Sequence, residues 1–216
     1  MPMQKNQIVQ AALDVLDRDG LEGVTLRRLA TELNVKAASI YYHIPSKERL
    51  LDEMANAILE EQFGTFDFEN DQRDWAEWLH KVAHELRRAM LRHREGARVV
   101  AGAHPDIAVV LVKLWDFTIR VLHKGGFSLG KAGVITITMI NFTFGSVIEE
   151  QASPPYAPGP PDAAQEIQSM GQRFQRVAIA MEAWMGGDSG APFDTGVRII
   201  INGVRAELAA EKTDAK

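Results

Sequence analysis

Cysteine is absent from the 216 residues, which excludes disulfides, thiolate metal sites and cysteine nucleophiles. Long hydrophobic runs are absent too, since charge or glycine interrupts each of them, so we expect no membrane partner. Residues 1–16 lack the pattern of a secretory signal peptide, and we therefore expect a cytoplasmic protein. Neither a glycine-rich phosphate loop nor a nucleophile elbow is present, so we expect neither a cofactor nor an enzyme.

Charge is unevenly distributed along the chain. The net charge is −5, which argues weakly against a nucleic-acid partner. Residues 1–50, however, hold seven Lys or Arg against six Asp or Glu, whereas the remaining residues hold 17 against 23. A basic module on an acidic body is expected where only the module meets phosphates. Ordinary scatter of surface charge explains the same counts equally well.

Apolar residues make up 46 % of the chain and recur at helical spacing, with no strand alternation, which predicts an all-α protein. A three-helix helix-turn-helix domain is expected over 1–46, and a larger helical effector-binding and dimerisation domain over 47–216. The stretch 152–161 holds five of the nine prolines and predicts a loop. Helices are expected near 26–33, 37–43, 47–62, 71–93, 95–102, 106–124, 128–151, 165–185 and 194–210.

Turn residues punctuate the first fifty positions. Gly20 is predicted to end the first helix, and Thr25 and Ser46 are suited to cap the helices that follow them. Asn34 tolerates the left-handed conformation that a tight turn requires. Two short helices joined by such a turn between residues 25 and 44 favour a helix-turn-helix, whose second helix fits the major groove. The apolar residues alone predict only a small helical core, but that does not account for two adjacent outward tyrosines.

The segment "VTLRRLATELNVKAASIYYHIPSKERLLD" at 24–52 resembles the N-terminal domain of the tetracycline-repressor (TetR) family of transcriptional regulators. It departs from the family at Asn34, where Gly is usual. The segments "HREGARVVAGAHP", "GGFSL" and "FTFGSVIEEQ" are similar to the C-terminal domain of the tetracycline repressors themselves, so the resemblance covers nearly the whole chain. It implies a ligand-responsive repressor that binds a palindromic double-stranded DNA operator as a homodimer.

By that resemblance, Arg27, Ala37 and Ala38 occupy base-reading positions, whereas Ser39, Tyr41 and Lys47 occupy phosphate-contacting ones. Tetracycline repressors have Gln and Pro where this chain has Ala37 and Ala38. Alanine cannot make the paired adenine contact of Gln, so we expect a different operator. The candidate DNA-binding residues are Thr25, Arg27, Lys36, Ala37, Ala38, Ser39, Tyr41, Tyr42, His43 and Lys47.

The resemblance also places an effector pocket in the C-terminal domain. Tetracycline repressors bind a drug–magnesium chelate through a His where this chain has Val100, and through His and Asn where it has Phe63 and Val82. Only Glu149 keeps the family's polar identity, so we expect weak or absent tetracycline binding and a small apolar or aromatic effector. The same apolar residues can instead be plain core. The candidate pocket residues are Phe63, Phe66, Val82, Leu86, Val100, Ala103, His104, Pro105, Trp115, Thr118, Asn141 and Glu149.

Two further features have a structural and a functional interpretation. Segments 128–151 and 194–210 are apolar on more than one face, which predicts a dimer interface or deep burial within one subunit. His80 and His84 lie one helical turn apart, but no third ligand stands near them in the sequence, so no metal site is expected. The alternative functions are a constitutive DNA-binding protein without an effector and a helical enzyme that has acquired a helix-turn-helix.

Overall fold

The computed structural model describes residues 4–152, 172–177, 179 and 190–214, and within them it contains helices and no strand. The all-α prediction is therefore confirmed. Ala152, the first residue of the predicted loop at 152–161, is the last residue of helix α8 (Leu129–Ala152). The rest of that loop and most of the predicted helix at 165–185 lie outside the described residues. The elements are α1 (Lys5–Asp19), the 3-10 turn η1 (Leu21–Gly23), α2 (Leu26–Glu32), α3 (Ala37–His43), α4 (Lys47–Phe63), α5 (Trp75–Leu91), α6 (Gly96–Ala101), α7 (Val109–Lys124), α8 (Leu129–Ala152) and α11 (Ala191–Asp214).

The predicted turn residues act as expected. Thr25 and Ser46 accept the backbone N–H groups of the residues three positions on, at 3.3 Å and 3.1 Å. Gly20 ends α1 with φ 77°, and Asn34 adopts φ 51° in the turn between α2 and α3. Local side-chain chemistry therefore fixes the ends of the first helices.

Three predicted helices begin or end elsewhere than expected. The helix expected from residue 71 begins at Trp75, because the carboxylate of Asp74 accepts the N–H groups of the next turn and forms a capping box with Glu77. The helix expected from residue 106 begins at Val109, after a hydrogen-bonded turn at 104–108. The last helix is longer than expected at both ends and spans Ala191–Asp214.

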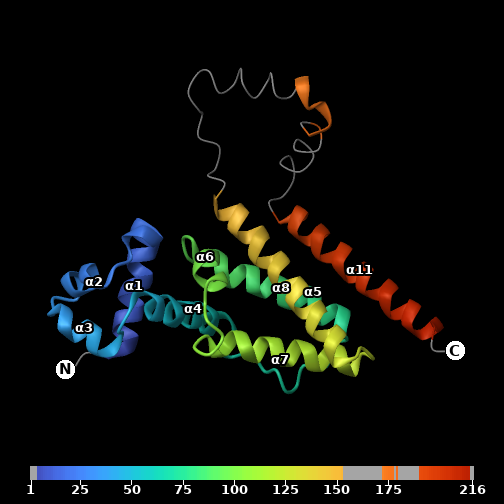
Figure 1. Ribbon diagram of the computed structural model, residues 1–216, viewed down its shortest axis with the longest axis horizontal. Coiled ribbons are helices and arrows are strands. Elements are labelled where there is room, and N and C mark those ends of the chain that lie inside the picture. The colour runs from blue at the N-terminus through green and yellow to red at the C-terminus, as the bar shows by residue number, and fades with distance from the viewer. Residues whose placement is uncertain (1–3, 153–171, 178, 180–189, 215–216) are drawn as a thin grey trace.

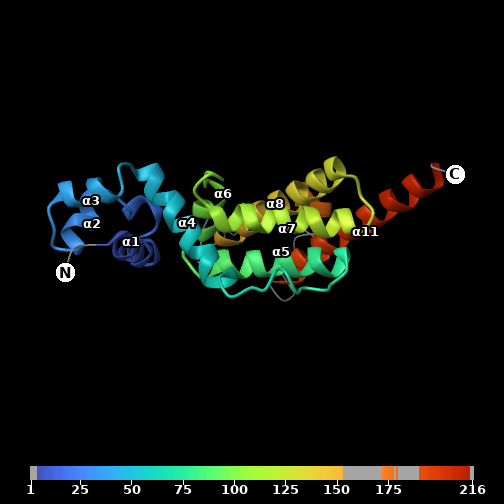
Figure 2. The same ribbon diagram turned by 90° about the horizontal axis from the view of Figure 1, so that it is seen from below.

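The molecule is elongated, with α1, α2 and α3 gathered at one end (Figure 1). Helix α4 leads from them into the body of the chain, where α5, α7 and α8 lie along the long axis (Figure 2). Helix α11 packs against α5 and α8 at the end remote from α3. Helix α4 is therefore the covalent link between the N-terminal helices and the body of the molecule.

Apolar packing is continuous from the N-terminal helices into the body. One cluster of buried residues includes Ile8 and Leu29, then Met54 and Ile58 of α4, then Trp78 of α5. Helix α4 packs against both the N-terminal helices and the body within this one cluster. The predicted division into domains at 1–46 and 47–216 therefore stays a prediction. A second cluster joins α11 to α5 and α8 through residues such as Phe193 and Val197.

Helix α8 is apolar on two sides but is covered on only one of them in the single chain. Ile135, Met139 and Val147 are buried, whereas Val134 is 60 % exposed and Ile137 is 41 % exposed. By length and composition alone α8 is apolar enough to cross a membrane, with a mean hydropathy of 1.4 over its best window. One such helix is weak evidence for a membrane span, because the core helix of a soluble protein can have the same length and composition. The buried side of α8 faces the interior of this fold.

Candidate DNA-binding surface and effector cavity

The exposed face of α3 comprises Lys36–Ser39, Tyr41 and Tyr42, and it is named here the recognition surface because the sequence predicts that these residues face DNA. Its interior counterpart, Ile40, is fully buried and anchors the helix on the core. Lys36, Ala37, Ala38 and Ser39 are exposed, and Tyr42 is 86 % exposed. Large exposed aromatic side chains next to small residues at a helix N-terminus suit a surface that approaches a base-pair edge closely.

Unpaired cations flank the recognition surface. Within the described part of the chain, Arg27, Lys36 and Lys47 form no ion pair, and Arg27 and Lys36 are exposed. On the other side of α2, Arg28 pairs with Asp19 at 2.5 Å, and Arg18 pairs with Glu32 at 2.5 Å. Arg27, Lys36 and Lys47 are therefore available to phosphates, whereas Arg18 and Arg28 are neutralised within the module.

The N-terminal module is held to the body by the junction turn, His93–Gly96, between α5 and α6. One carboxylate oxygen of Asp17 accepts the Arg94 N–H at 2.9 Å, and the other lies 3.0 Å from His93 Nδ1. The Glu95 carboxylate accepts the Leu21 N–H at 2.7 Å. The turn thus contacts both α1 and η1 through charge-assisted hydrogen bonds.

The junction turn is also fixed from the side of α8. The Gln151 amide oxygen accepts the Ala97 N–H at 3.0 Å, and its NH₂ group donates to the carbonyls of Met90 and His93 at 3.1 Å and 2.8 Å. The end of α8 is therefore hydrogen-bonded to the same turn that contacts the N-terminal module.

We expect attachment of the module to weaken in acid because of Glu95. The N–H group of Leu21 lowers the pKa of Glu95 below its usual 4.5, assisted by Arg98 and opposed by desolvation. A group with a lowered folded pKa contributes stability above its unfolded pKa and loses it as the pH falls through the folded value. The protection factor of the Leu21 amide, which is its exchange rate corrected for the intrinsic pH dependence of exchange, is therefore expected to fall below pH ~4 relative to neutral pH.

The control for this pH effect is Glu95→Gln, which keeps an acceptor of similar size but does not titrate. Its Leu21 amide is expected to lack the part of the pH dependence that comes from Glu95. An identical acid-dependent profile in the wild type and this variant contradicts the assignment.

Helix α4 is tied to the segment between α6 and α7. The buried Asp52 carboxylate accepts the His104 N–H at 2.8 Å and lies 3.1 Å from His104 Nδ1. One turn later, the Asn56 amide oxygen accepts the Val110 N–H at 3.2 Å. The ring of His104, a predicted pocket residue, therefore contacts Asp52 of α4. The His104 side chain is 64 % exposed.

An enclosed apolar cavity lies between α5, α7 and α8. Its volume is about 10 Å³, far below the 300–1,000 Å³ that ligand sites of this kind occupy. The hydroxyls that line it, on Thr118, Thr136 and Thr143, donate to backbone carbonyls four residues earlier in their own helices. The cavity thus offers an apolar surface, and α5, α7 and α8 must separate to admit a ligand.

The predicted pocket residues are not all brought together. Val82, Leu86 and Thr118 line the enclosed cavity. Phe63 and Val100 are buried in the core, with Phe66, Ala103 and Trp115 half-buried. His104, Pro105, Asn141 and Glu149 are exposed on the single chain. No observation tests these assignments, which stay predictions.

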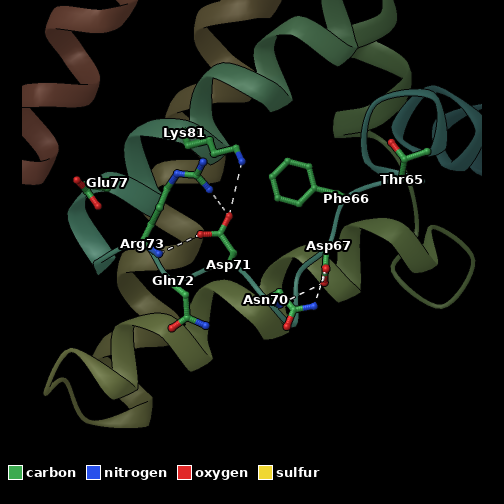
Figure 3. A pocket seen from close by; sticks show the side chains of 9 residues that line it. All are labelled: Thr65, Phe66, Asp67, Asn70, Asp71, Gln72, Arg73, Glu77 and Lys81. Carbon is green, nitrogen blue, oxygen red and sulfur yellow. Dashed lines mark hydrogen bonds and ion pairs between the residues drawn. The ribbon is translucent and has the colours of Figure 1, made fainter.

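A larger groove of about 630 Å³ opens on the surface between the end of α4 and α5 (Figure 3). Phe66 lies in it, with the Lys81 ammonium 4.0 Å from the ring centroid. The Asp71 carboxylate pairs with Arg73 and with Lys81, at 3.6 Å for the latter. Asp71, Arg73 and Lys81 are thus paired with one another within the groove, and of the predicted pocket residues the groove contains Phe66 alone.

Sequence reasoning missed the side chains that connect the two ends of the molecule. Asp17, Glu95, Gln151, Asp52 and Asn56 each bind a backbone group more than 50 residues away. No local pattern marks a polar residue that caps a distant turn, so only the tertiary structure identifies them.

Sequence profiles of two domains match the chain. "Bacterial regulatory proteins, tetR family" matches residues 8–54, and "Tetracyclin repressor-like, C-terminal domain" matches residues 69–208. The class C tetracycline repressor protein of Escherichia coli is 35 % identical over 204 residues, covering 94 % of this chain and 90 % of that protein.

Solved structures agree with the sequence matches. A possible TetR-family transcriptional regulator from Streptomyces coelicolor A3(2) has a TM-score of 0.80 at 31 % identity, over 94 % of this chain and 99 % of its own. A TetR variant from Acinetobacter baumannii AYE in complex with minocycline has a TM-score of 0.71 at 29 % identity, over 94 % and 97 %. The chain therefore belongs to the tetracycline-repressor (TetR) family of DNA-binding, ligand-responsive transcriptional regulators.

Proposed function

We propose that this chain is a cytoplasmic repressor whose dimer binds a palindromic operator through α3 and releases it when an apolar or aromatic effector binds. The observation that carries the DNA-binding role is the recognition surface, with Tyr42 86 % exposed and the unpaired Arg27 and Lys47 beside it. The candidate DNA-binding residues listed from the sequence remain our assignment. No catalytic role is proposed, because the chain offers no constellation of nucleophile and base in its sequence.

The proposed release mechanism uses the two hydrogen-bonded links to the module. A ligand that enters between α5, α7 and α8 displaces α8 or the segment before α7. Gln151 carries the first movement to the junction turn, and Asp52 carries the second to α4. Because α4 and the turn both contact α1, the spacing of the two recognition helices in the dimer changes. A coupling of roughly 1–3 kcal/mol changes operator affinity 5- to 150-fold.

One polar group in the body is suited to orient an effector. The Trp115 indole N–H on α7 is buried and has no hydrogen-bond partner among the described residues. A buried unpaired donor costs free energy unless a ligand or water accepts from it. An acceptor atom on an otherwise apolar compound satisfies this donor, which supports the proposed effector class.

Selection of binding sites from random duplex DNA tests the DNA-binding role. We expect a palindrome with half-sites about one DNA turn apart and an affinity that falls steeply with salt. Tyr42→Ala is expected to weaken binding by about 10-fold with unchanged thermal stability, because the ring is exposed in free protein. Lys113→Ala, a surface change on α7, is the matched control. Binding that lacks a palindrome or is unchanged in Tyr42→Ala contradicts the proposal.

Titration with magnesium and tetracycline tests the effector class. Val100 is fully buried and Phe63 is 2 % exposed, and neither offers a metal ligand or a polar contact. We therefore expect no binding at micromolar concentration by calorimetry, with a tetracycline repressor as the positive control. Micromolar or tighter binding refutes the proposed apolar effector.

A further inference from the structure

Helix α11 brings a third polar side chain to the two histidines of α5. His80 Nε2 lies 2.7 Å from Asp194 Oδ1, and His84 Nε2 lies 3.1 Å from the same oxygen. Asp194 lies more than 100 residues from the histidines in the sequence. The expectation of no metal site was made from the sequence without this third candidate ligand. Among the described residues, these three form the group whose ligand atoms all lie within 4.8 Å of one another.

We propose that His80, His84 and Asp194 bind a divalent transition-metal ion of the zinc class, which joins α11 to α5. Zinc takes imidazole nitrogen and carboxylate oxygen ligands at ~2.0–2.2 Å, so its tetrahedral ligands stand about 3.4 Å apart. The Nε2–Oδ1 separations of 2.7 Å and 3.1 Å are slightly shorter. Metal bonds replace the hydrogen bonds when these separations widen by about 0.3–0.7 Å and the proton between each Nε2 and Oδ1 moves to imidazole Nδ1 or to solvent.

Neighbouring side chains hold the ligands in place. The Arg198 guanidinium forms an ion pair with Asp194 Oδ2 at 2.9 Å, while Oδ1 faces the histidines. The Phe193 ring packs edge-on against His84 with centroids 5.2 Å apart. Partners of this kind orient metal ligands in known sites.

The cluster is open to solvent on the side of His80. His80 lines a groove of about 680 Å³ between α5 and α11, together with Glu77, Lys81 and Arg198. A water from this groove completes a four-coordinate ion, and the same opening gives an entry path.

A metal bound here acts on the helix that carries an exposed apolar face. Phe193 and Val197 bury one side of α11 against the body, while Ile199 on its other side is 66 % exposed. Linking Asp194 to α5 through a metal adds a bond between α11 and the body. The metal is therefore expected to stabilise the folded chain.

The test uses untagged, full-length protein purified with a chelator. At neutral pH, Zn²⁺ is expected to bind once per chain in calorimetry, and Co²⁺ to give visible absorption bands typical of a protein-bound ion. At a Zn²⁺ concentration about 100 times Kd, Tm is expected to rise by roughly 5–10 °C. His84→Gln and Asp194→Asn are each expected to weaken Zn²⁺ binding at least about 10-fold. His123→Gln, which removes an imidazole outside the cluster, is expected to bind as the wild type does.

Absence of saturable binding up to about 0.1 mM Zn²⁺ overturns the proposal. Equal affinity in the wild type and in both ligand variants also overturns it. His80→Gln is a safeguard against misfolding, since the His80 side chain is 45 % exposed. Loss of the Co²⁺ bands in this variant, with unchanged helicity by circular dichroism, supports the site.

Discussion

Charging the exposed faces of α8 and α11 is expected to convert the protein to monomers and to lower operator affinity at least about 100-fold. The change is Val134→Asp combined with Ile199→Asp. These side chains are 60 % and 66 % exposed in the single chain, and we expect a partner subunit to cover them. Each carboxylate must lose its water shell when the dimer forms, at a cost of several kcal/mol. Since a dimer divides its binding free energy between two half-sites, a monomer binds far more weakly.

Light scattering after size-exclusion chromatography measures the mass, and operator titration measures the affinity. Val109→Asp, at an exposed position that begins α7, is the control and is expected to stay dimeric. If the double variant does not fold as a monomer, Ile199→Ala provides the milder test, with a dimer dissociation constant raised roughly 10- to 100-fold. A dimer as tight as the wild type in both variants rules out this face as the interface.

Adding one methyl group at Gly96 is expected to destabilise the protein by about 3 kcal/mol. A Cβ on Gly96 would stand 2.4 Å from the Met90 carbonyl oxygen and 3.4 Å from the His93 Cβ. The first of these atoms belongs to the backbone, so no side-chain rotation relieves the overlap. The junction turn must shift, and its bonds to Asp17 and Leu21 must lengthen or break.

Thermal unfolding checks this expectation, with a fall in Tm of roughly 6–12 °C for a chain of this size. Gly102→Ala is the matched control at the other end of α6, where a Cβ would meet only carbonyl oxygens at 3.3 Å and 3.9 Å. We expect that variant to stay within about 0.5 kcal/mol of the wild type. A Gly96→Ala protein as stable as Gly102→Ala means that the turn adjusts without strain.

Much of the fold was predictable because its signals are local. Helical periodicity identified the helices, and Thr25, Asn34 and Ser46 fixed where the first ones begin and end. The long motif at 24–52 identified the family, which the sequence and structure comparisons confirm. The start of α5 was missed because Asp74, rather than the first apolar residue, decides where that helix begins.

The two predicted sites also differ in whether their residues lie close together in the chain. The recognition surface follows from one short helix, whose exposed positions are set by the 3.6-residue period and the buried Ile40. The pocket requires three helices to converge, and periodicity does not say which apolar faces meet. Val82 and Thr118 line one cavity, whereas the polar residues Asn141 and Glu149 lie exposed on α8.

The sequence by itself determined the helical class, the helix-turn-helix and the family, because these depend on residues close together in the chain. The tertiary structure decided which distant polar groups meet: Glu95 with Leu21, Gln151 with Ala97, and Asp194 with His80 and His84. A hydrogen bond or a metal site requires atoms to approach within about 3 Å. Over separations of 50 to more than 100 residues, that proximity comes from the packing of whole helices and not from any pattern within one of them.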